Sequence, residues 1–198
     1  MEKTEVILDV SARHVHIRPE DVEVLFGRPD ALTLRQNHSS AFAGKGQEVF
    51  NERVKLVGPK GTIENVTILG PLRKYQQAEI SKTDARALGV DAVIRLSGHH
   101  DGTPGIDIVG PCGTLKLEAG CIVAKRHVHM SEKLAAELGH KNGDIISVEV
   151  TGTERPLVFH NVSIEAYPVE KMPTVMHIDT DEANAADIKP GLIGKLIV

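Results

Sequence analysis

The chain contains the tetrapeptide Arg-His-Val-His twice, at residues 13–16 and again at residues 126–129. Side chains alternate between the two faces of an extended strand, so the two histidines of each copy point the same way. Two imidazoles on one face can reach a common transition metal without bending the backbone. One such pair can arise by chance in a half-exposed strand, but duplication of the whole tetrapeptide predicts metal binding. The pairs are His14 with His16 and His127 with His129.

Composition limits the fold and the partners of the chain. Its 198 residues are enough for one large domain or two small ones. Aromatic residues are scarce, with no Trp, two Tyr and four Phe, so the core must be built from Val, Ile, Leu and Ala. The net charge is −4 and no long basic run is present, which argues against nucleic acid as a partner.

The sequence carries no sign of secretion or membrane insertion. No signal peptide precedes the strand-like residues 6–10, and no apolar run approaches the roughly 20 residues that a membrane span needs. Cys112 and Cys121 match no zinc or redox spacing, and we interpret them as reduced thiols. We therefore expect a cytoplasmic protein without membrane contact.

One local unit recurs four times along the chain. Residues 5–16 are predicted as one strand that ends in the first histidine pair, and a short helix follows from Pro19 until Gly27 stops it. Each later copy is again a strand that ends in a metal-capable residue, then a short capped helix and a glycine. The four units join His14 and His16 to Gly27, Glu79 to Gly89, His127 and His129 to Gly139, and His177 to Gly191.

The remaining segments predict a mainly β fold with two β-barrel domains and short capping helices. Residues 28–52 have no period and are interpreted as a long loop that contains a solvated His38. His99 and His100 are assigned to a solvent-exposed turn. Many short strands, few helices and a duplicated motif favour two barrel-like units with ligands that converge between them. Strands are predicted at 54–57, 63–69, 72–80, 92–98, 106–123, 144–151, 156–165, 174–178 and 193–198.

The candidate ligands predict two metal ions rather than one. Five histidines and one glutamate are too many for a tetrahedral ion, but they suit two ions with about three protein ligands each and an open catalytic position. Nitrogen and carboxylate ligands favour zinc. Arg73 shares an extended face with Glu79, and its guanidinium would suit a phosphate or carboxylate. Together with anion-binding helix N-termini, these features indicate chemistry on an anionic substrate.

Over nearly its whole length, the chain resembles the PduL-type phosphate acyltransferases, which occur in bacterial microcompartments and in acetate- and propionate-forming metabolism. No single piece is specific, but the combination is. The matching pieces are Val-Ser-Ala-Arg-His-Val-His at 10–16, Gly-Pro-Lys-Gly at 58–61, Ile-Glu-Asn-Val at 63–66, Ile-Leu-Gly-Pro-Leu-Arg at 68–73, Arg-His-Val-His-Met at 126–130 and His-Ile-Asp-Thr-Asp-Glu-Ala-Asn at 177–184.

The resemblance implies exchange of acyl-CoA and phosphate with acyl phosphate and CoA, at two zinc ions per chain. It implies a discontinuous barrel of residues 1–12 with 125–198, a second barrel of residues 13–124 that includes the 28–52 loop, an active site between them, and a possible homodimer. Arg73 matches the phosphate-binding arginine of the family. The implied zinc ligands are His14, His16 and Glu79 for one ion and His127, His129 and His177 for the other; the implied CoA-contacting residues are Val10, Ser11, Ala12, Lys60 and Asn184.

The chain departs from the family pattern at three places. Thr67 stands where the family often has an arginine that helps to hold CoA, and the loop at 35–44 matches the family only loosely. Microcompartment members often carry an amphipathic N-terminal extension, whereas this chain starts directly on its first strand. A cytoplasmic enzyme is therefore expected.

A direct transfer fits these residues, because no serine or cysteine nucleophile motif is visible. One zinc would polarise the thioester carbonyl and stabilise the leaving CoA thiolate, while the other zinc and Arg73 hold phosphate in line. Two alternatives remain open. One is a dinuclear zinc hydrolase of thioesters or phosphate esters, and the other is a non-catalytic barrel module that binds a metal or an anion. Acetyl and propanoyl both fit as the acyl group.

Overall fold

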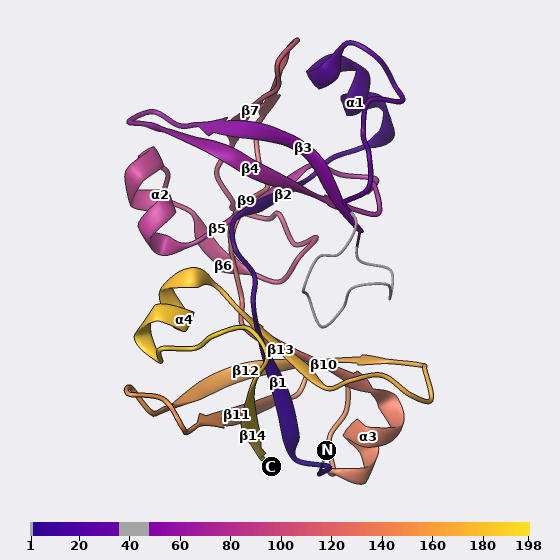
Figure 1. Ribbon diagram of the computed structural model, residues 1–198, viewed down its shortest axis with the longest axis vertical. Helices are drawn as coiled ribbons and strands as arrows, with labels where there is room; N and C mark the ends of the chain where they lie inside the picture. The colour runs from indigo at the N-terminus through magenta and orange to yellow at the C-terminus, as the bar shows by residue number, and fades with distance from the viewer. Residues whose placement is uncertain (1, 36–47) are drawn as a thin grey trace. The chain divides into compact units, whose positions relative to one another are not determined.

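The computed structural model describes residues 2–35 and 48–198, and the chain divides into two compact units (Figure 1). One unit consists of residues 1–11 with 125–198, and the other consists of residues 12–124. The chain thus passes from one unit to the other twice. Each passage comes directly before one copy of Arg-His-Val-His, so the two histidines of each copy lie on the first strand after the passage, β2 or β10.

The discontinuous unit is a closed six-stranded barrel. Its strands follow the order β1-β13-β10-β12-β11-β14, and the antiparallel pairing of β1 with β14 closes the ring. Apolar side chains alternate along the strands and point inward, as at Val6 and Leu8 of β1, which are fully buried. The elements are β1 (Glu5–Val10), β10 (His127–Ser131), α3 (Glu132–Glu137), β11 (Ile145–Val150), β12 (Leu157–Tyr167), β13 (Val175–Ile178), α4 (Thr180–Ala185) and β14 (Leu192–Ile197).

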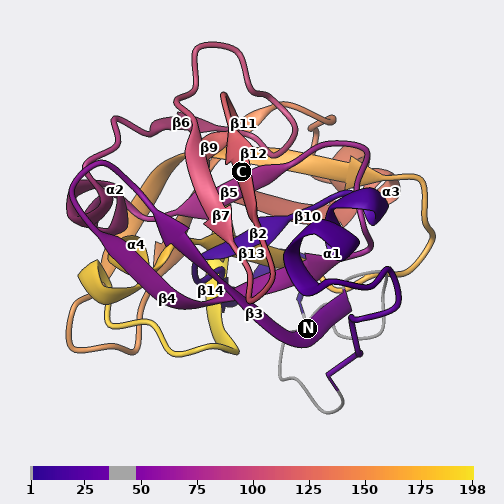
Figure 2. The ribbon, with the colours of Figure 1, turned by 90° about the horizontal axis from the view of Figure 1, so that it is seen from above.

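The other unit is a curled, half-barrel sheet of eight strands in the order β6-β9-β5-β2-β4-β3-β7-β8. Its longest feature is the hairpin of β3 and β4, which can be followed in Figures 1 and 2. The elements are β2 (His14–His16), α1 (Pro19–Phe26), β3 (Glu48–Val57), β4 (Thr62–Gly70), β5 (Gln77–Ile80), α2 (Lys82–Leu88), β6 (Val93–Arg95), β7 (Ile106–Val109), β8 (Thr114–Leu117) and β9 (Cys121–Ala124).

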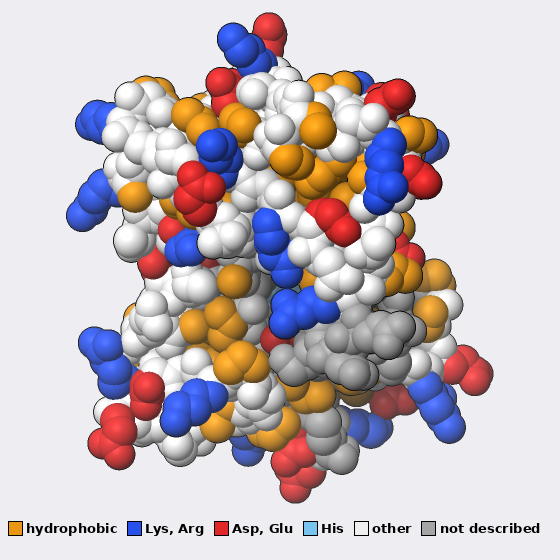
Figure 3. All heavy atoms as spheres, turned by 45° about the horizontal axis from the view of Figure 1, so that its top comes forward, with side chains coloured by type: hydrophobic (Ala, Val, Ile, Leu, Met, Phe, Trp, Pro, Cys, Tyr) orange, Lys and Arg blue, Asp and Glu red, His pale blue; other side chains and the backbone are white. Residues whose placement is uncertain are grey.

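Each unit has its own apolar core, and both cores have the expected composition. Valine, isoleucine, leucine and alanine dominate them, and among the described residues Phe50 and Phe159 are the buried aromatic side chains. The predicted mainly β fold with barrel-like units and short helices is therefore confirmed. Acidic and basic side chains are interspersed on the face shown in Figure 3. None of the helices in the described ranges has the length and apolar character needed to cross a membrane.

The prediction of one continuous strand at residues 5–16 is wrong. Strand β1 ends at Val10 and β2 begins at His14, and the two belong to different sheets. The same break separates β9 from β10 within the predicted strand that ends at His129. Alternation in the sequence cannot reveal that the hydrogen-bonding partners change at these breaks, since partners are set by strands distant in the chain.

Other boundaries also differ from the sequence prediction, and the strand predicted at 106–123 is divided into β7, β8 and β9. The loop predicted at 28–52 ends earlier, because β3 begins at Glu48 and Leu34 already bridges to Phe50. Residues 36–47, which include His38, lie outside the described residues. The strand predicted at 72–80 is limited to β5, and Arg73 precedes it with its backbone N–H donating to the carbonyl of Ile17.

Candidate metal centres

The first group of candidate ligands comes from two antiparallel neighbours, β2 and β5. In this pairing His14 lies directly opposite Glu79, and His16 follows on the same face of β2. All three side chains are buried, and one ligand atom from each lies within 4.8 Å of the others. The Nε2 atom of His14 is 3.5 Å from one carboxylate oxygen of Glu79, and Nε2 of His16 is 3.6 Å from the other. We call these three residues the first triad.

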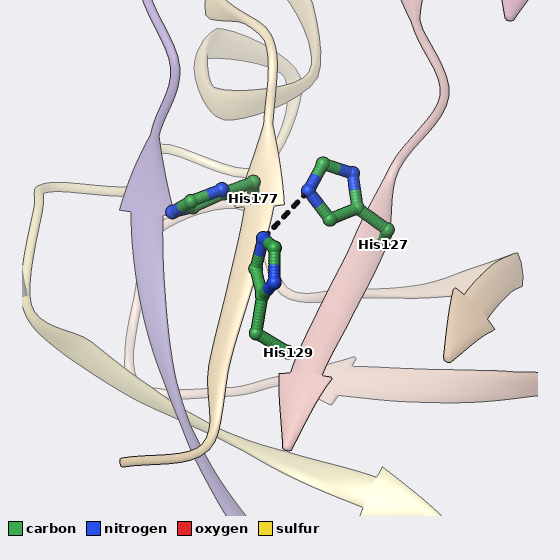
Figure 4. Close-up of side chains that lie close together, drawn as sticks. All are labelled: His127, His129 and His177. Carbon is green, nitrogen blue, oxygen red and sulfur yellow. Dashed lines mark hydrogen bonds between the residues drawn. The ribbon is translucent and has the colours of Figure 1, made fainter. Parts of the chain in front are cut away.

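The second group is built in the same way on β10 and β13. His127 lies opposite His177 in the antiparallel pair, and His129 follows on β10. Figure 4 shows the three rings on neighbouring strands, with His127 and His129 turned toward each other. Their Nε2 atoms are 2.9 Å apart, and a ligand atom from each of the three residues falls within 4.8 Å of the others. We call these three residues the second triad.

Backbone carbonyls fix the protonation of three of the five histidines. A carbonyl oxygen can only accept, so the Nδ1 atom that faces it must carry the hydrogen and donate it. Each of these rings therefore points its Nε2 atom into its triad, and in the neutral ring this atom carries the lone pair that a metal would bind. The acceptors are Ala12 for His14 at 2.9 Å, Leu69 for His16 at 3.1 Å and Lys125 for His127 at 2.8 Å.

Hydrogen bonds between side chains fix the position of the Nδ1 hydrogen of His129 in the same way. The hydroxyl of Tyr167 donates to a carboxylate oxygen of Glu165 at 3.0 Å, so its oxygen accepts from Nδ1 of His129 at 3.0 Å. Nε2 of His129 and Nε2 of His127 face each other across 2.9 Å. Burial, with the charges of His127 and His177, lowers the pKa of His129 to about 2, so the His129 ring is neutral near neutral pH. The lone pair on its Nε2 is therefore available to an N–H donor or to a metal cation.

The electrostatics of the first triad keep Glu79 ionised. Burial acts against its charged form, but His14 and His16 outweigh burial and hold the pKa of Glu79 well below its usual range. Burial also works against a charged His14, yet the attraction of Glu79 raises the pKa of that ring, while for His16 burial wins and lowers it. The first triad thus offers a carboxylate together with two imidazoles.

Both triads fit zinc. Ligand atoms around a tetrahedral zinc lie about 3.4 Å apart, given bonds of roughly 2.0–2.2 Å. The 3.5 and 3.6 Å separations in the first triad and the 2.9 Å separation in the second lie on either side of this value. Nitrogen and carboxylate donors suit zinc, and three protein ligands leave a fourth position for a substrate atom.

Sequence reasoning missed the buried support of Glu79. Gln77 is fully buried, and its Nε2 donates to Glu79 Oε1 at 2.6 Å and to Ser97 Oγ at 2.9 Å. Its Oε1 accepts from the backbone N–H of Gly98 and from Nε2 of His100, each at 2.8 Å. The prediction that His100 is a solvated turn residue is therefore wrong. The shared face of Gln77 and Glu79 on the strand was the available signal.

Acidic residues also surround the second triad without belonging to it. Asp9 of β1 lies beside β13, with Oδ2 3.8 Å from Nε2 of His177. Glu165 stands behind His129, with Oε2 3.6 Å from Nδ1 of that ring. No sequence spacing connects these acids to the histidine pair, because the register between strands brings them there.

Arg73 lies near the first triad. Its positive charge acts against protonation of both His14 and His16, although burial is the larger influence on each and Glu79 raises the pKa of His14 overall. Its Nε atom is buried and has no hydrogen-bond partner among the described residues. A buried guanidinium N–H without a partner is unfavourable, and the oxygen of a phosphate or carboxylate would satisfy it.

The five predicted CoA-contacting residues fall in both units. In the barrel unit, Val10 ends β1, the N–H of Ser11 donates to Ile178, and Asn184 is exposed on α4. In the other unit, Ala12 precedes β2 and Lys60 is exposed in the turn between β3 and β4. The structure does not gather them into one group within either unit.

In three of the helices a side-chain cap already occupies one of the N–H groups that were predicted to bind an anion, and at α3 this cap is Ser131 Oγ, which accepts from the N–H of Leu134 at 3.1 Å. At α2, Ser81 Oγ already accepts from the N–H of Asp84 at 3.1 Å. At α4, Asp179 Oδ1 accepts from the N–H of Glu182 at 2.8 Å. The acidic side chains in these first turns would also repel an anion.

Comparisons with known proteins agree with one another. The family model described as phosphate propanoyltransferase matches residues 7–189. The chain is 47% identical over 187 residues to the phosphate propanoyltransferase of Salmonella typhimurium, which covers 94% of this chain and 85% of that protein. It is 48% identical over 190 residues to that of Thermotoga maritima, with 94% and 86% covered. It is 50% identical over 190 residues to that of Lachnoclostridium phytofermentans, with 95% and 85% covered.

Proposed function

The chain belongs to the phosphate propanoyltransferase family, and from this premise we propose that it transfers a short acyl group, such as propanoyl or acetyl, between coenzyme A and inorganic phosphate with two zinc ions per chain. In the forward direction a phosphate oxygen bonds to the thioester carbon, the carbon–sulfur bond breaks, and CoA leaves as the thiolate. The observation that supports this proposal is the pair of three-residue triads, each one protein ligand short of the four that a closed tetrahedral zinc site has.

In this proposal, His14, His16 and Glu79 hold one ion, and His127, His129 and His177 hold the other. Zinc would supply Lewis acidity at the thioester carbonyl and positive charge for the leaving sulfur. The protein's part is to hold both ligand sets in place, and the hydrogen bonds from Nδ1 do this for four of the rings.

Arg73 is the proposed phosphate-binding residue. Its unpaired, buried Nε would donate to one phosphate oxygen, and the rest of the guanidinium would grip a second in a fork. Held in this way, phosphate can keep its attacking oxygen in line with the thioester carbon, which turns a collision between two molecules into a step within one complex.

The cysteines take no part in the proposed reaction. Burial raises the pKa of Cys121 to about 12, so this thiol is not a nucleophile near neutral pH. Cys112 is exposed on the surface and is not among the candidate ligands of either triad. Direct attack by phosphate therefore needs no acyl-enzyme.

Coenzyme A would be held by Val10, Ser11, Ala12, Lys60 and Asn184. The exposed ammonium of Lys60 suits the phosphates of CoA, whereas Thr67 offers no charge at its position on β4. Affinity for CoA in this chain would therefore depend more on Lys60 than it does in relatives with an arginine at the position of Thr67.

The test is release of free CoA from propanoyl-CoA and acetyl-CoA, with and without inorganic phosphate. The measurement is repeated after chelation and again after zinc is restored. We expect release that needs phosphate and returns with zinc, and the ratio of the two rates would identify the preferred acyl group. Equal release without phosphate would instead identify a hydrolase.

A further inference from the structure

The arginine of each Arg-His-Val-His motif forms an ion pair with an acidic residue that is distant in the sequence. Arg13 binds the carboxylate of Asp84 through two contacts, from Nε at 2.9 Å and from Nη2 at 2.7 Å. Arg126 places its Nε 3.1 Å from a carboxylate oxygen of Glu182. Neither arginine belongs to a group of candidate ligands, so the function proposed above assigns them no role.

Both acids occupy the same position of a helix cap. Asp84 is the third residue of α2, whose cap is Ser81, and Glu182 is the third residue of α4, whose cap is Asp179. Each acid also accepts from the backbone N–H of its cap residue, at 3.3 Å for Ser81 and 3.4 Å for Asp179. Each arginine therefore binds an acid that also closes the N-terminal cap of its helix.

Both caps stand next to the third ligand of a triad. Ser81 is the next residue but one after Glu79, and Asp179 is the next residue but one after His177. A cap that is held in place therefore fixes the end of the strand that carries this ligand.

The arrangement is the same in two units with separate cores. In both, the strand that follows the arginine carries the histidine pair, and its antiparallel neighbour carries the third ligand opposite the first histidine. The neighbouring strands are otherwise unlike, Gln-Ala-Glu-Ile in β5 and Val-Met-His-Ile in β13. The same ion pair recurs at corresponding positions beside strands of unlike sequence, which indicates that both pairs have the same function.

We propose that Arg13 and Arg126 are positioning residues that hold the third ligand of each triad against its histidine pair, Arg13 for Glu79 and Arg126 for His177. The inference rests on the proposed function, because it takes the triads to be metal sites. If the third ligand is already fixed before the metal binds, less conformational entropy is lost on binding. Asp84 is 4% exposed, so without Arg13 its charge would be buried and unpaired, and the cap beside Glu79 would rearrange.

The test measures zinc affinity at one triad at a time, by competition with a coloured chelator. Arg13→Gln is placed in a chain whose second triad is removed by His127→Ala with His129→Ala. Arg126→Gln is placed in a chain whose first triad is removed by His14→Ala with His16→Ala. We expect each arginine variant to weaken zinc binding at its own triad by on the order of 10–100-fold, and to leave the other triad unchanged in the reciprocal background.

Each helix offers a matched control. Lys82 on α2 donates from Nζ to the carbonyl of Ala92 at 2.6 Å, and Arg155 donates from Nη1 to the carbonyl of Asn184 on α4 at 3.0 Å. Lys82→Gln and Arg155→Gln each remove a basic contact of the same helix without touching the cap acid. Zinc affinity should match the wild type in both.

Conservative and partner variants separate positioning from general loss of stability. Arg126→Lys should retain most of the affinity because Arg126 meets its acid through one nitrogen, and Arg13→Lys only part because Arg13 meets its acid through two. Glu182→Gln should reproduce Arg126→Gln, and the double variant should be no worse than either. Thermal unfolding of the zinc-free proteins reports stability separately.

The outcomes separate the two proposals. Zinc affinity unchanged at both triads in the arginine variants would overturn the positioning role and leave the proposed function standing. Equal losses at both triads, in parallel with lower thermal stability, would also overturn it. Absence of zinc binding by the wild-type chain would overturn both the positioning role and the zinc-dependent function.

Discussion

The two triads share one strand arrangement and differ in where their negative charge lies. In the first, the third ligand is Glu79, a carboxylate kept ionised by the two histidines despite its burial. In the second, the third ligand is His177, and the acids Asp9 and Glu165 stand around the imidazoles rather than among them. The same antiparallel arrangement of two strands can therefore present either an anionic or a neutral ligand set.

This difference in charge predicts that the two triads attract a fourth ligand with different strength. A zinc ion held by neutral ligands keeps more of its charge for a fourth ligand than one that is bound by a carboxylate. The second triad would therefore attract phosphate or the leaving thiolate more strongly than the first. The supports differ as well, since Gln77 behind Glu79 is fully buried, whereas Tyr167 behind His129 is 37% exposed.

Removing the charge from the first triad should give the largest effect. Glu79→Gln makes both ligand sets neutral, and the amide is a poor zinc ligand. We expect zinc content to fall from two ions per chain to one, and activity to fall by roughly 10³-fold or more, the scale on which a catalytic group acts. Metal analysis and CoA release check this. Full activity with one zinc would show that the first triad is dispensable.

Removing Arg73 should give the next largest effect. Arg73→Gln is expected to lower kcat/KM for phosphate by roughly 10²–10³-fold, the usual cost of losing a donor aimed at developing charge. The KM for the acyl-CoA should stay close to the wild-type value. Lys74→Gln alters the exposed neighbouring residue and serves as the control. A fall in affinity for acyl-CoA alone would reassign Arg73 to coenzyme binding.

Changing the supporting residues should sharpen the contrast between the triads. Gln77→Leu leaves Glu79 without its donor in a buried site, so zinc affinity at the first triad should fall by on the order of 10–100-fold. Tyr167→Phe should cost the second triad less, because water can reach His129 at the exposed tyrosine and replace the hydroxyl. Zinc competition in the single-triad backgrounds measures both. A larger loss of zinc affinity in Tyr167→Phe than in Gln77→Leu would contradict this comparison.

Acidification should destabilise the zinc-free barrel unit through His129, with the smallest effect of the four. Its pKa is about 2 in the folded chain and about 6.5 when exposed, so between these values only the unfolded chain takes up the proton. The free energy of unfolding should therefore fall as pH drops below about 6.5, with a contribution from His129 of up to about 1.4 kcal/mol per pH unit.

Urea unfolding at several pH values, with His129→Gln for comparison, measures this slope. The variant should show a shallower loss of stability, while His160→Gln, which changes an exposed histidine of the same unit, should follow the wild type. An unchanged slope in His129→Gln would show that this imidazole is not held neutral in the folded chain.

Local patterns predicted the parts of the site that depend on neighbours in sequence. Alternation placed the histidines of each pair on one face, and cap residues located the helices α2 and α4 after Glu79 and His177. The grouping into two triads depends on strand register between distant segments. Resemblance to a family suggested this grouping, whereas periodicity could not.

The missed features have the same origin. Alternation continues through the break after Val10, so the change of sheet is invisible in the sequence. The roles of Gln77 and His100 depend on a turn folding back onto β5, and the partner of Arg13 lies on a helix 71 residues away in the chain. Such contacts are fixed by tertiary packing, which single-sequence patterns do not encode.

The most direct test of the account is activity measured as zinc is returned to the metal-free chain. We expect two equivalents to bind in the wild type, and phosphate-dependent CoA release to appear only as the second site fills. Chains that lack either histidine pair, by His14→Ala with His16→Ala or by His127→Ala with His129→Ala, should bind one equivalent and stay inactive. Full activity at one equivalent, or in either half-site chain, would contradict the claim that two different zinc sites act together.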